Sequence, residues 1–155
     1  MIERSIYSQI LHGITIRPVT LITGARRVGK TTLCLKLRDE KGFGYVSLRD
    51  KNERAMARSD PDMFLRIHQC PLIIDEVQYA PGFLESIEAV TDRMKVEGRD
   101  NTGMFVLTCS QVHKLTEKVS DDGMNSTDRS RQSMRMNGRY LFIPFTICLL
   151  MCGSS

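Results

Sequence analysis

The sequence predicts a doubly wound α/β fold, with a mainly parallel sheet of four or five strands and helices on both faces. Short apolar runs typical of strands alternate with stretches of helical period, which is the element order of such folds. Residues 72–74 are wholly apolar, and a strand buried on both faces needs a helical layer on each side of the sheet. Polar motifs follow the expected strands at their carboxyl ends, where open α/β sheets bind ligands.

Strands and helices alternate through the first half of the chain. Ile6, Ile10 and Leu11 recur at helical spacing and predict the first helix. Asp60 is a favourable N-cap, and Pro61 a favourable first residue, for the last helix of this half. In order, we expect a helix at 5–12, a strand at 19–23, a helix at 30–38, a strand at 45–48, a helix at 53–58 and a helix that starts at 60.

The second half continues the alternation. Phe83, Leu84 and Ile87 begin an apolar stripe at spacings of three and four residues, which predicts an amphipathic helix. A turn at 101–103 precedes the fourth strand. In order, we expect a strand at 72–74, the amphipathic helix, a strand at 104–108 and a helix at 111–119.

Composition and charge limit the class of protein. The 155 residues suffice for one domain with a continuous core. The 22 basic and 18 acidic side chains give a net charge of +4 and are scattered, which permits contact with nucleic acid without favouring it. The N-terminus lacks the apolar core of a signal peptide, and the apolar run at 140–152 is shorter than the roughly 20 residues of a membrane span. We therefore expect a cytoplasmic protein without a membrane segment.

Residues 24–32, GARRVGKTT, have the form G-x-x-x-x-G-K-[ST] and lie between an apolar strand and a helix. Gly24 and Gly29 allow backbone N–H groups to converge on a phosphate, and the following helix directs its N-terminus to the same point. Lys30 adds a positive charge for the β and γ phosphates, and Thr31 a hydroxyl for Mg²⁺. The expected phosphate-binding residues are Gly24, Ala25, Arg26, Arg27, Val28, Gly29, Lys30, Thr31 and Thr32.

The third strand ends in Asp75 and Glu76, within LIIDEV. A carboxylate at this point beside a phosphate loop is suited to hold Mg²⁺, and a second one to orient and deprotonate a water molecule. We therefore interpret Asp75 as a metal residue and Glu76 as the catalytic base, with Lys30 as its catalytic partner. Two acids that merely end a strand are the alternative, which the phosphate loop disfavours. A base beside the metal carboxylate favours hydrolysis over transfer to an acceptor hydroxyl.

The fourth strand ends in a second polar segment, residues 108–111. If this strand lies between the first and third strands, its terminal groups face the γ phosphate, and Ser110 is the expected nucleotide contact. A helix N-cap is the alternative role for a hydroxyl here. Asp50 either lies near the nucleotide or belongs to a turn, and the three histidines are expected to be structural or surface residues.

Five segments, in this order and spacing, resemble the AAA-like P-loop ATPases of bacteria and archaea, whose ATP-binding domain precedes a C-terminal domain of unknown function. They are GARRVGKTT, YVSLRD, NERAMARSDPDMFL, LIIDEVQYAP and FVLTCSQ, within residues 1–119. The resemblance implies a P-loop NTPase-type sheet, binding of ATP and Mg²⁺ by the phosphate loop, a Walker B pair in Asp75 and Glu76, and a sensor at 108–111. Cys109 stands where the family usually has glycine.

The family continues with an S-L-A-G-R-like segment, a fifth strand and a second domain, whereas residues 120–155 form an atypical tail rich in polar residues at its start. Two interpretations stay open. Either the chain is truncated or frame-shifted after about residue 120, or Arg139 belongs to a displaced arginine segment and residues 140–143 form the fifth strand. A missing fifth strand would leave one edge of the strand at 19–23 exposed.

These observations predict ATP binding and Mg²⁺-dependent ATP hydrolysis, with an arginine supplied by a neighbouring subunit of a homo-oligomer. The alternative is a truncated module that binds ATP without appreciable hydrolysis. A nucleic-acid partner is a third hypothesis, and only the net charge and the arginines of the tail prompt it.

Overall fold

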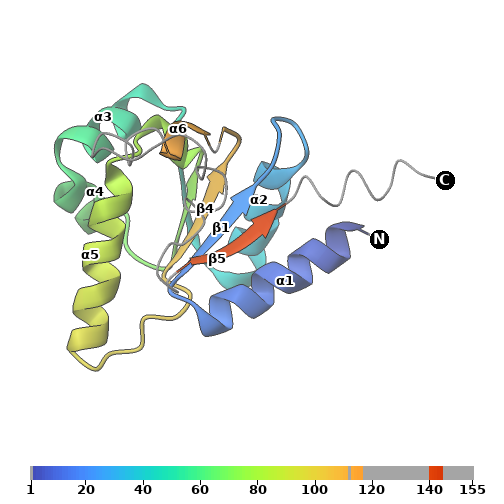
Figure 1. The fold of residues 1–155 in the computed structure, drawn as a ribbon, viewed down its shortest axis with the longest axis horizontal. Coiled ribbons are helices and arrows are strands. Elements are labelled where there is room, and N and C mark those ends of the chain that lie inside the picture. The colour runs from blue at the N-terminus through green and yellow to red at the C-terminus, as the bar shows by residue number, and fades with distance from the viewer. Residues whose placement is uncertain (1, 112, 117–139, 145–155) are drawn as a thin grey trace, which may run out of the picture.

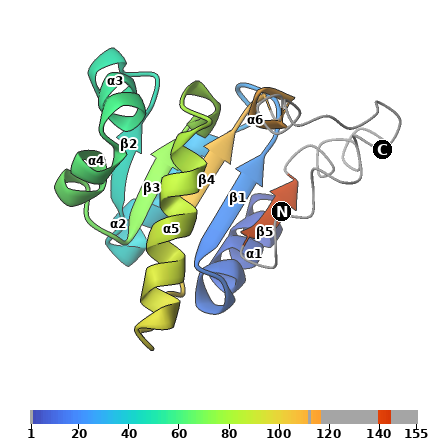
Figure 2. The same ribbon diagram turned by 60° about the vertical axis from the view of Figure 1, so that its left-hand side comes forward.

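The computed structural model describes residues 2–111, 113–116 and 140–144. They form a five-stranded sheet in the order β2-β3-β4-β1-β5, and every strand pair is parallel. Figure 2 shows the five strands side by side in this order, with α5 in front of them. The strands are β1 (Val19–Thr23), β2 (Gly44–Ser47), β3 (Leu72–Asp75), β4 (Phe105–Cys109) and β5 (Tyr140–Pro144). The predicted α/β fold class is therefore confirmed.

Helices cover both faces of this sheet (Figure 1). They are α1 (Ile2–Ile16), α2 (Lys30–Lys41), α3 (Lys51–Ser59), α4 (Pro61–Ile67), α5 (Phe83–Val96) and α6 (His113–Thr116), with a 3-10 turn η1 (Val77–Tyr79) after β3. Leu21, Ile74 and Leu107 point to the face covered by α3, α4 and α5, whereas Ile22 and Ile73 point to the face covered by α1 and α2. Successive residues of one strand thus pack into two different cores, because side chains alternate between the two faces of the sheet along a strand.

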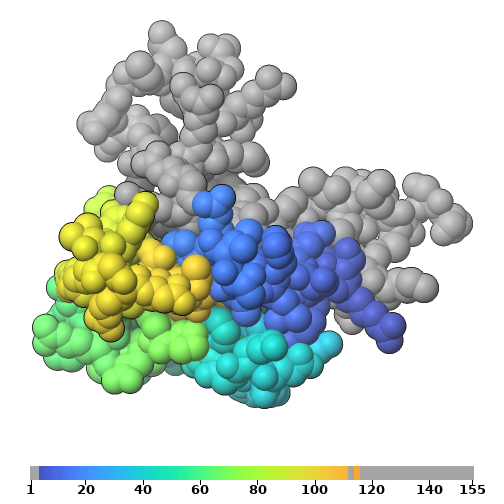
Figure 3. All heavy atoms as spheres, turned by 90° about the horizontal axis from the view of Figure 1, so that it is seen from below, coloured from blue at the N-terminus to red at the C-terminus, as the bar shows by residue number. Residues whose placement is uncertain are grey.

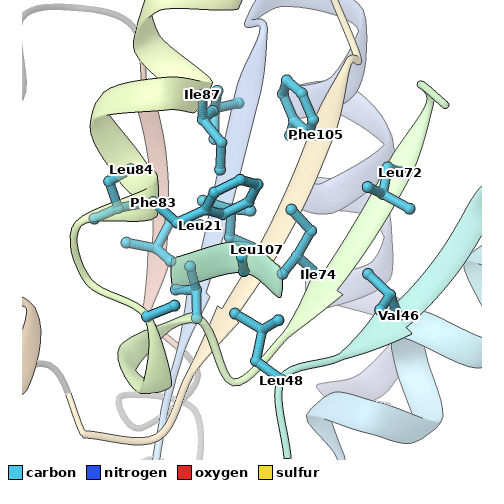
Figure 4. Close-up of a cluster of buried hydrophobic side chains, with 14 of the residues drawn as sticks. Leu21, Val46, Leu48, Leu72, Ile74, Phe83, Leu84, Ile87, Phe105 and Leu107 are labelled. Atoms are coloured by element: carbon cyan, nitrogen blue, oxygen red, sulfur yellow. The ribbon is translucent and has the colours of Figure 1, made fainter. Parts of the chain in front are cut away.

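The larger core lies under α5. Figure 4 shows Phe83 and Ile87 of this helix directed at the side chains of the sheet, and Leu84 belongs to the same buried cluster. The same cluster includes Phe64 of α4, whose ring centroid lies 4.9 Å from that of Phe83 in an edge-to-face contact. All residues of β1, β3 and β4 are buried, so the expectation that residues 72–74 are covered on both faces is confirmed.

Helices α1, α2 and α3 differ in length from the sequence prediction, and α3 covers Lys51–Ser59 rather than 53–58. α1 runs from residue 2 to 16 rather than 5 to 12, because burial of Ile6 and Ile10 stabilises a segment whose Gly13 and Thr15 have low helix propensity. α2 continues to Lys41 and ends where Gly42 adopts a left-handed conformation. The strand at 45–48 begins one residue earlier, since the Gly44 N–H donates to the Pro71 carbonyl at 2.9 Å.

The turn before β4 contacts the end of α1. The Gly103 N–H donates to the Arg17 carbonyl oxygen at 2.8 Å, and Figure 3 shows these blue and gold segments next to each other. Gly103 has a φ of +63°, and a Cβ at this position would lie 2.7 Å from the carbonyl oxygen of Ile14. Only glycine fits there, so this turn fixes where β4 enters the sheet beside β1.

The strand order decides which chain segments meet at the carboxyl edge of the sheet. β4 lies between β1 and β3, as the expectation about residues 108–111 required. The loop after β1, the acids that end β3 and the polar residues that end β4 therefore lie next to one another. The domain boundary at residue 119 stays a prediction, and Arg139 lies outside the described residues.

Candidate functional site

The loop at residues 24–29 connects β1 to α2. Its first residue is attached to the neighbouring strand, because the Gly24 N–H donates to the Cys109 carbonyl oxygen at 3.2 Å. Gly29 precedes α2 with a φ of +94°, a left-handed conformation that glycine adopts without steric cost. Among the residues that the structure describes, no side chain caps this helix, so its first N–H groups are available to an anion.

Lys30 crosses the inside of this loop. Its ammonium group donates to the carbonyl oxygens of Gly24 and Ala25, both at 2.7 Å, and the residue is only 4% exposed. Burial lowers the pKa of Lys30, whereas the carboxylates of Glu76 and Asp75 act in the opposite direction. The ammonium is thus a buried donor between the loop and the acidic pair.

The two arginines of the loop are exposed. The Arg26 guanidinium donates to the Tyr79 hydroxyl at 2.9 Å, and Arg27 is among the residues that line the pocket described below. Arg27 has a φ of +64°, which is uncommon for a residue with a side chain. Ala25 and Thr32 are also exposed, and Val28 is half-buried.

Asp75, at the end of β3, is buried among hydroxyl donors. Its Oδ1 accepts from the Thr108 hydroxyl at 2.5 Å, and its Oδ2 accepts from the Tyr45 hydroxyl at 3.0 Å and the Thr31 hydroxyl at 3.3 Å. Burial, reinforced by the Asp75 carboxylate, raises the pKa of Tyr45, so the phenol remains a neutral donor. The two residues predicted to hold Mg²⁺, Thr31 and Asp75, therefore lie in contact.

Glu76 has a conformation rare for a residue with a Cβ, with φ at +60° and ψ at +52°. Its N–H donates to the Thr108 hydroxyl at 2.8 Å, which ties this backbone to β4. Left-handed residues of this kind cost about 1–3 kcal/mol and cluster at functional sites. The strained backbone places a carboxylate that is only 2% exposed beside the phosphate loop.

The Glu76 carboxylate accepts hydrogen bonds from three side chains. Oε2 accepts from Gln78 and from the Ser110 hydroxyl, the latter at 2.6 Å, and Oε1 accepts from Arg49 at 2.7 Å. Burial alone would raise the pKa of Glu76, but the hydrogen bonds from Ser110, Gln78 and Arg49 outweigh it and lower the pKa to about 2. The carboxylate is therefore ionised at neutral pH.

A pocket of about 230 Å³ lies between the loop and Glu76. Its lining residues are Arg27, Gly29, Lys30, Thr31, Thr32, Arg49 and Glu76. The structure thus brings the second half of the loop and the predicted base to one cavity. The other predicted site residues are not among its lining residues: Gly24, Ala25, Arg26, Val28, Asp75 and Ser110. The Ser110 hydroxyl donates to Glu76, and its expected contact with a nucleotide stays a prediction.

Sequence reasoning missed three contributors to this site: Arg49, Gln78 and Tyr45. Arg49 follows β2 at the same edge of the sheet as Asp75, so the rule that ligands bind at carboxyl ends was a signal for it. Gln78 lies in the turn after Glu76, and no pattern in the sequence places its amide on that carboxylate.

Other sequence predictions concern residues away from the pocket. Asp50 caps α3, since its carboxylate accepts from the N–H groups of Asn52 and Glu53, so the turn interpretation is correct. His68 pairs with Glu53 at 2.7 Å, and His12 is exposed. In the described part of the chain, no three His, Cys, Asp or Glu side chains form a metal cluster, and no helix has the length and apolar character of a membrane span.

The family model described as AAA domain matches residues 16–141, a range that begins at the end of α1 and reaches into β5. No curated protein matches the chain. The matched range includes the phosphate loop, the acidic pair and the polar end of β4. Because the match covers most of its length, the chain belongs to the AAA domain family.

Proposed function

We propose that this protein hydrolyses ATP in a Mg²⁺-dependent reaction. Membership of the AAA domain family indicates nucleotide binding and ATPase-type activity in general terms. The observation that carries the finer proposal is the position of Lys30 and Glu76 in the walls of one pocket, with Thr31 and Asp75 in contact beside it. Phosphate loop, metal residues and base are the parts that ATP hydrolysis requires.

Each of these residues has a task in the proposed reaction. The free N–H groups at the start of α2 and the Lys30 ammonium bind the β and γ phosphates. Thr31 and Asp75 supply the hard oxygen ligands that Mg²⁺ prefers, and their 3.3 Å contact fits a shared ion. Bound Mg²⁺ neutralises charge on the phosphate oxygens. Glu76 orients a water molecule and accepts its proton.

Lys30→Ala and Glu76→Gln test the proposal because they affect different steps. Lys30→Ala removes the phosphate charge, so we expect calorimetry to show loss of ATP binding. Glu76→Gln keeps the binding residues but removes the base, so we expect ATP affinity within about tenfold of the parent and turnover lowered about 100-fold or more. Arg66→Ala, at an exposed position on α4, serves as the control for both measurements.

A parent-like hydrolysis rate in Glu76→Gln would show that the assigned base is wrong. Unchanged ATP binding in Lys30→Ala would contradict the assignment of the phosphate loop. Melting temperatures of the three variants show whether a loss of binding reflects a loss of fold.

A second candidate function is ATP binding without appreciable hydrolysis. The three donors on Glu76 favour it, because a carboxylate with a pKa of about 2 is a weak base in the nucleotide-free protein. ATP binding with no phosphate release at any protein concentration supports this candidate. A rate of ATP turnover per subunit that rises with protein concentration favours hydrolysis instead. Such a rise indicates a homo-oligomer in which the neighbouring subunit supplies an arginine.

A further inference from the structure

Arg49 lines the phosphate pocket, yet the proposed reaction gives it no task. It follows the end of β2, and its guanidinium donates to Glu76 Oε1 at 2.7 Å. The Arg49 side chain is 56% exposed, whereas its partner is 2% exposed. The carboxylate of this ion pair is therefore buried, whereas the exposed arginine side chain has space to move away from it.

The two oxygens of Glu76 have different environments. Oε2 accepts from Ser110 and Gln78, which hold the carboxylate in place from the side of β4 and η1. Among the described residues, Oε1 accepts a hydrogen bond from Arg49 alone. Before any water molecule binds in the pocket, Oε2 thus already accepts from two donors, and Oε1 already accepts from Arg49. While the guanidinium stays on Oε1, it stabilises the charged carboxylate and so opposes proton transfer from a water molecule to Glu76.

The backbone of Arg49 is fixed, while its guanidinium is held at one point. Its N–H donates to the Ser47 hydroxyl at 3.3 Å, and its carbonyl oxygen accepts from Arg54 at 2.9 Å. The side chain therefore pivots about an anchored Cα. Within reach lies the pocket lined by Gly29, Lys30 and Thr31, where the phosphate groups are proposed to bind.

We propose that Arg49 exchanges Glu76 for the terminal phosphate of a bound nucleoside triphosphate, and so acts within its own subunit. A guanidinium forms strong, charge-assisted hydrogen bonds with phosphate oxygens, which offset the loss of the carboxylate. The exchange frees Oε1 for the attacking water and brings positive charge to the γ phosphate. A diphosphate has no γ phosphate, so Arg49 remains on Glu76 when ADP is bound. This inference rests on the proposed ATP site.

The test compares the Mg²⁺ complexes of ADP and of the imido analogue of ATP, which resists hydrolysis, by calorimetry on the full chain. Arg49→Ala removes a charged hydrogen bond to the γ phosphate only, so we expect its affinity for the ATP analogue to fall about tenfold or more. Its affinity for ADP should stay within about threefold. Arg49→Lys keeps the positive charge but loses the planar, two-pronged donor geometry of the guanidinium. Its affinity for the ATP analogue should therefore lie between those of Arg49→Ala and the parent. Arg66→Ala is the matched control at an exposed arginine.

An unchanged ratio of the two affinities in Arg49→Ala overturns the inference, because a residue that only supports Glu76 affects both nucleotides alike. If Arg49→Ala does not fold, Arg49→Lys and Arg49→Gln decide the question by the same ratio. Failure of the parent chain to bind either nucleotide overturns the proposed function, and this inference with it. Parent binding of both nucleotides with an unchanged ratio in the variants overturns the inference alone.

Discussion

One threonine fixes the geometry of both carboxylates in the site. The Thr108 hydroxyl donates to Asp75 Oδ1 and accepts from the Glu76 N–H, and the residue is fully buried in β4. A single oxygen thus satisfies two buried polar groups and holds Glu76 in its left-handed conformation. The pairing of β3 with β4 brings these groups together.

Thr108→Val should therefore lower the free energy of unfolding by more than a typical removal of a hydroxyl group. The change keeps the shape of the side chain but leaves the Glu76 N–H and an Asp75 oxygen without this partner. We expect the free energy of unfolding to fall by about 1–3 kcal/mol, measured by urea denaturation at pH 7.

The matched control is Thr20→Val in β1. Thr20 is also fully buried, but its hydroxyl has no hydrogen-bond partner in the described part of the chain. Its replacement by a methyl group should leave stability within about 0.5 kcal/mol or raise it. Equal losses in the two variants would show that the Thr108 hydrogen bonds contribute nothing specific.

The sequence predicts some residues of the site and not others for a physical reason. The spacing of Gly24, Gly29 and Lys30 is local, because the anion cradle forms within one loop and one helix start. Asp75 and Glu76 follow from the end of an apolar strand beside that loop. The hydrogen bonds of Arg49 and Ser110 to Glu76 depend on which strands are neighbours and on a left-handed turn, and neither property appears as a local pattern.

At the scale of elements, Tyr7 of α1 makes polar contacts with α2 in addition to the apolar packing of Ile6 and Ile10. The Tyr7 hydroxyl donates to a Glu40 oxygen at 2.5 Å, and the Lys36 ammonium lies 4.4 Å from the centroid of the Tyr7 ring. Burial first, and the Glu40 carboxylate second, raise the pKa of Tyr7 to about 12. The neutral phenol is the form that donates to Glu40, so folding favours the protonated state.

This contact predicts a pH dependence at alkaline pH. The folded pKa lies above the ordinary value of 10.0, so the contact contributes fully below pH 10 and is lost as pH rises toward 12. In urea denaturation, we expect the parent to be more stable than Tyr7→Phe at pH 8.5 and to lose this advantage by pH 11.5. A stability difference that is the same at both pH values would contradict the assigned titration.

The start of α4 was easier to predict than the length of α1. Asp60 caps α4 from the position that the sequence indicates, and Pro61 begins the helix, because both effects act within one turn. The length of α1 depends on burial of Ile6 and Ile10 against α2 and the sheet, which is tertiary. Helical spacing alone therefore predicts a helix that is too short at both ends.

At the scale of the whole molecule, β5 gives β1 a neighbour on its second side. β1 pairs with β4 on one side and with β5 on the other, with Val19 opposite Tyr140 and Thr23 opposite Pro144. The strand that leads into the phosphate loop is thus interior to the sheet. The sequence left residues 140–143 undecided between a tail and a fifth strand, because a parallel partner far along the chain leaves no local signal.

Two chains that differ by this strand alone test its contribution. A chain of residues 1–144 retains β5, whereas a chain of residues 1–139 ends just before it and exposes the edge of β1. Loss of the ladder hydrogen bonds should lower the free energy of unfolding of the shorter chain by about 2–5 kcal/mol in urea denaturation. Sedimentation should show more aggregation, since an unpaired edge is free to pair with another chain.

The phosphate loop starts at the end of β1, so we also expect weaker ATP binding by the shorter chain. Equal stability and equal ATP affinity of the two chains would mean that β5 does not support the site.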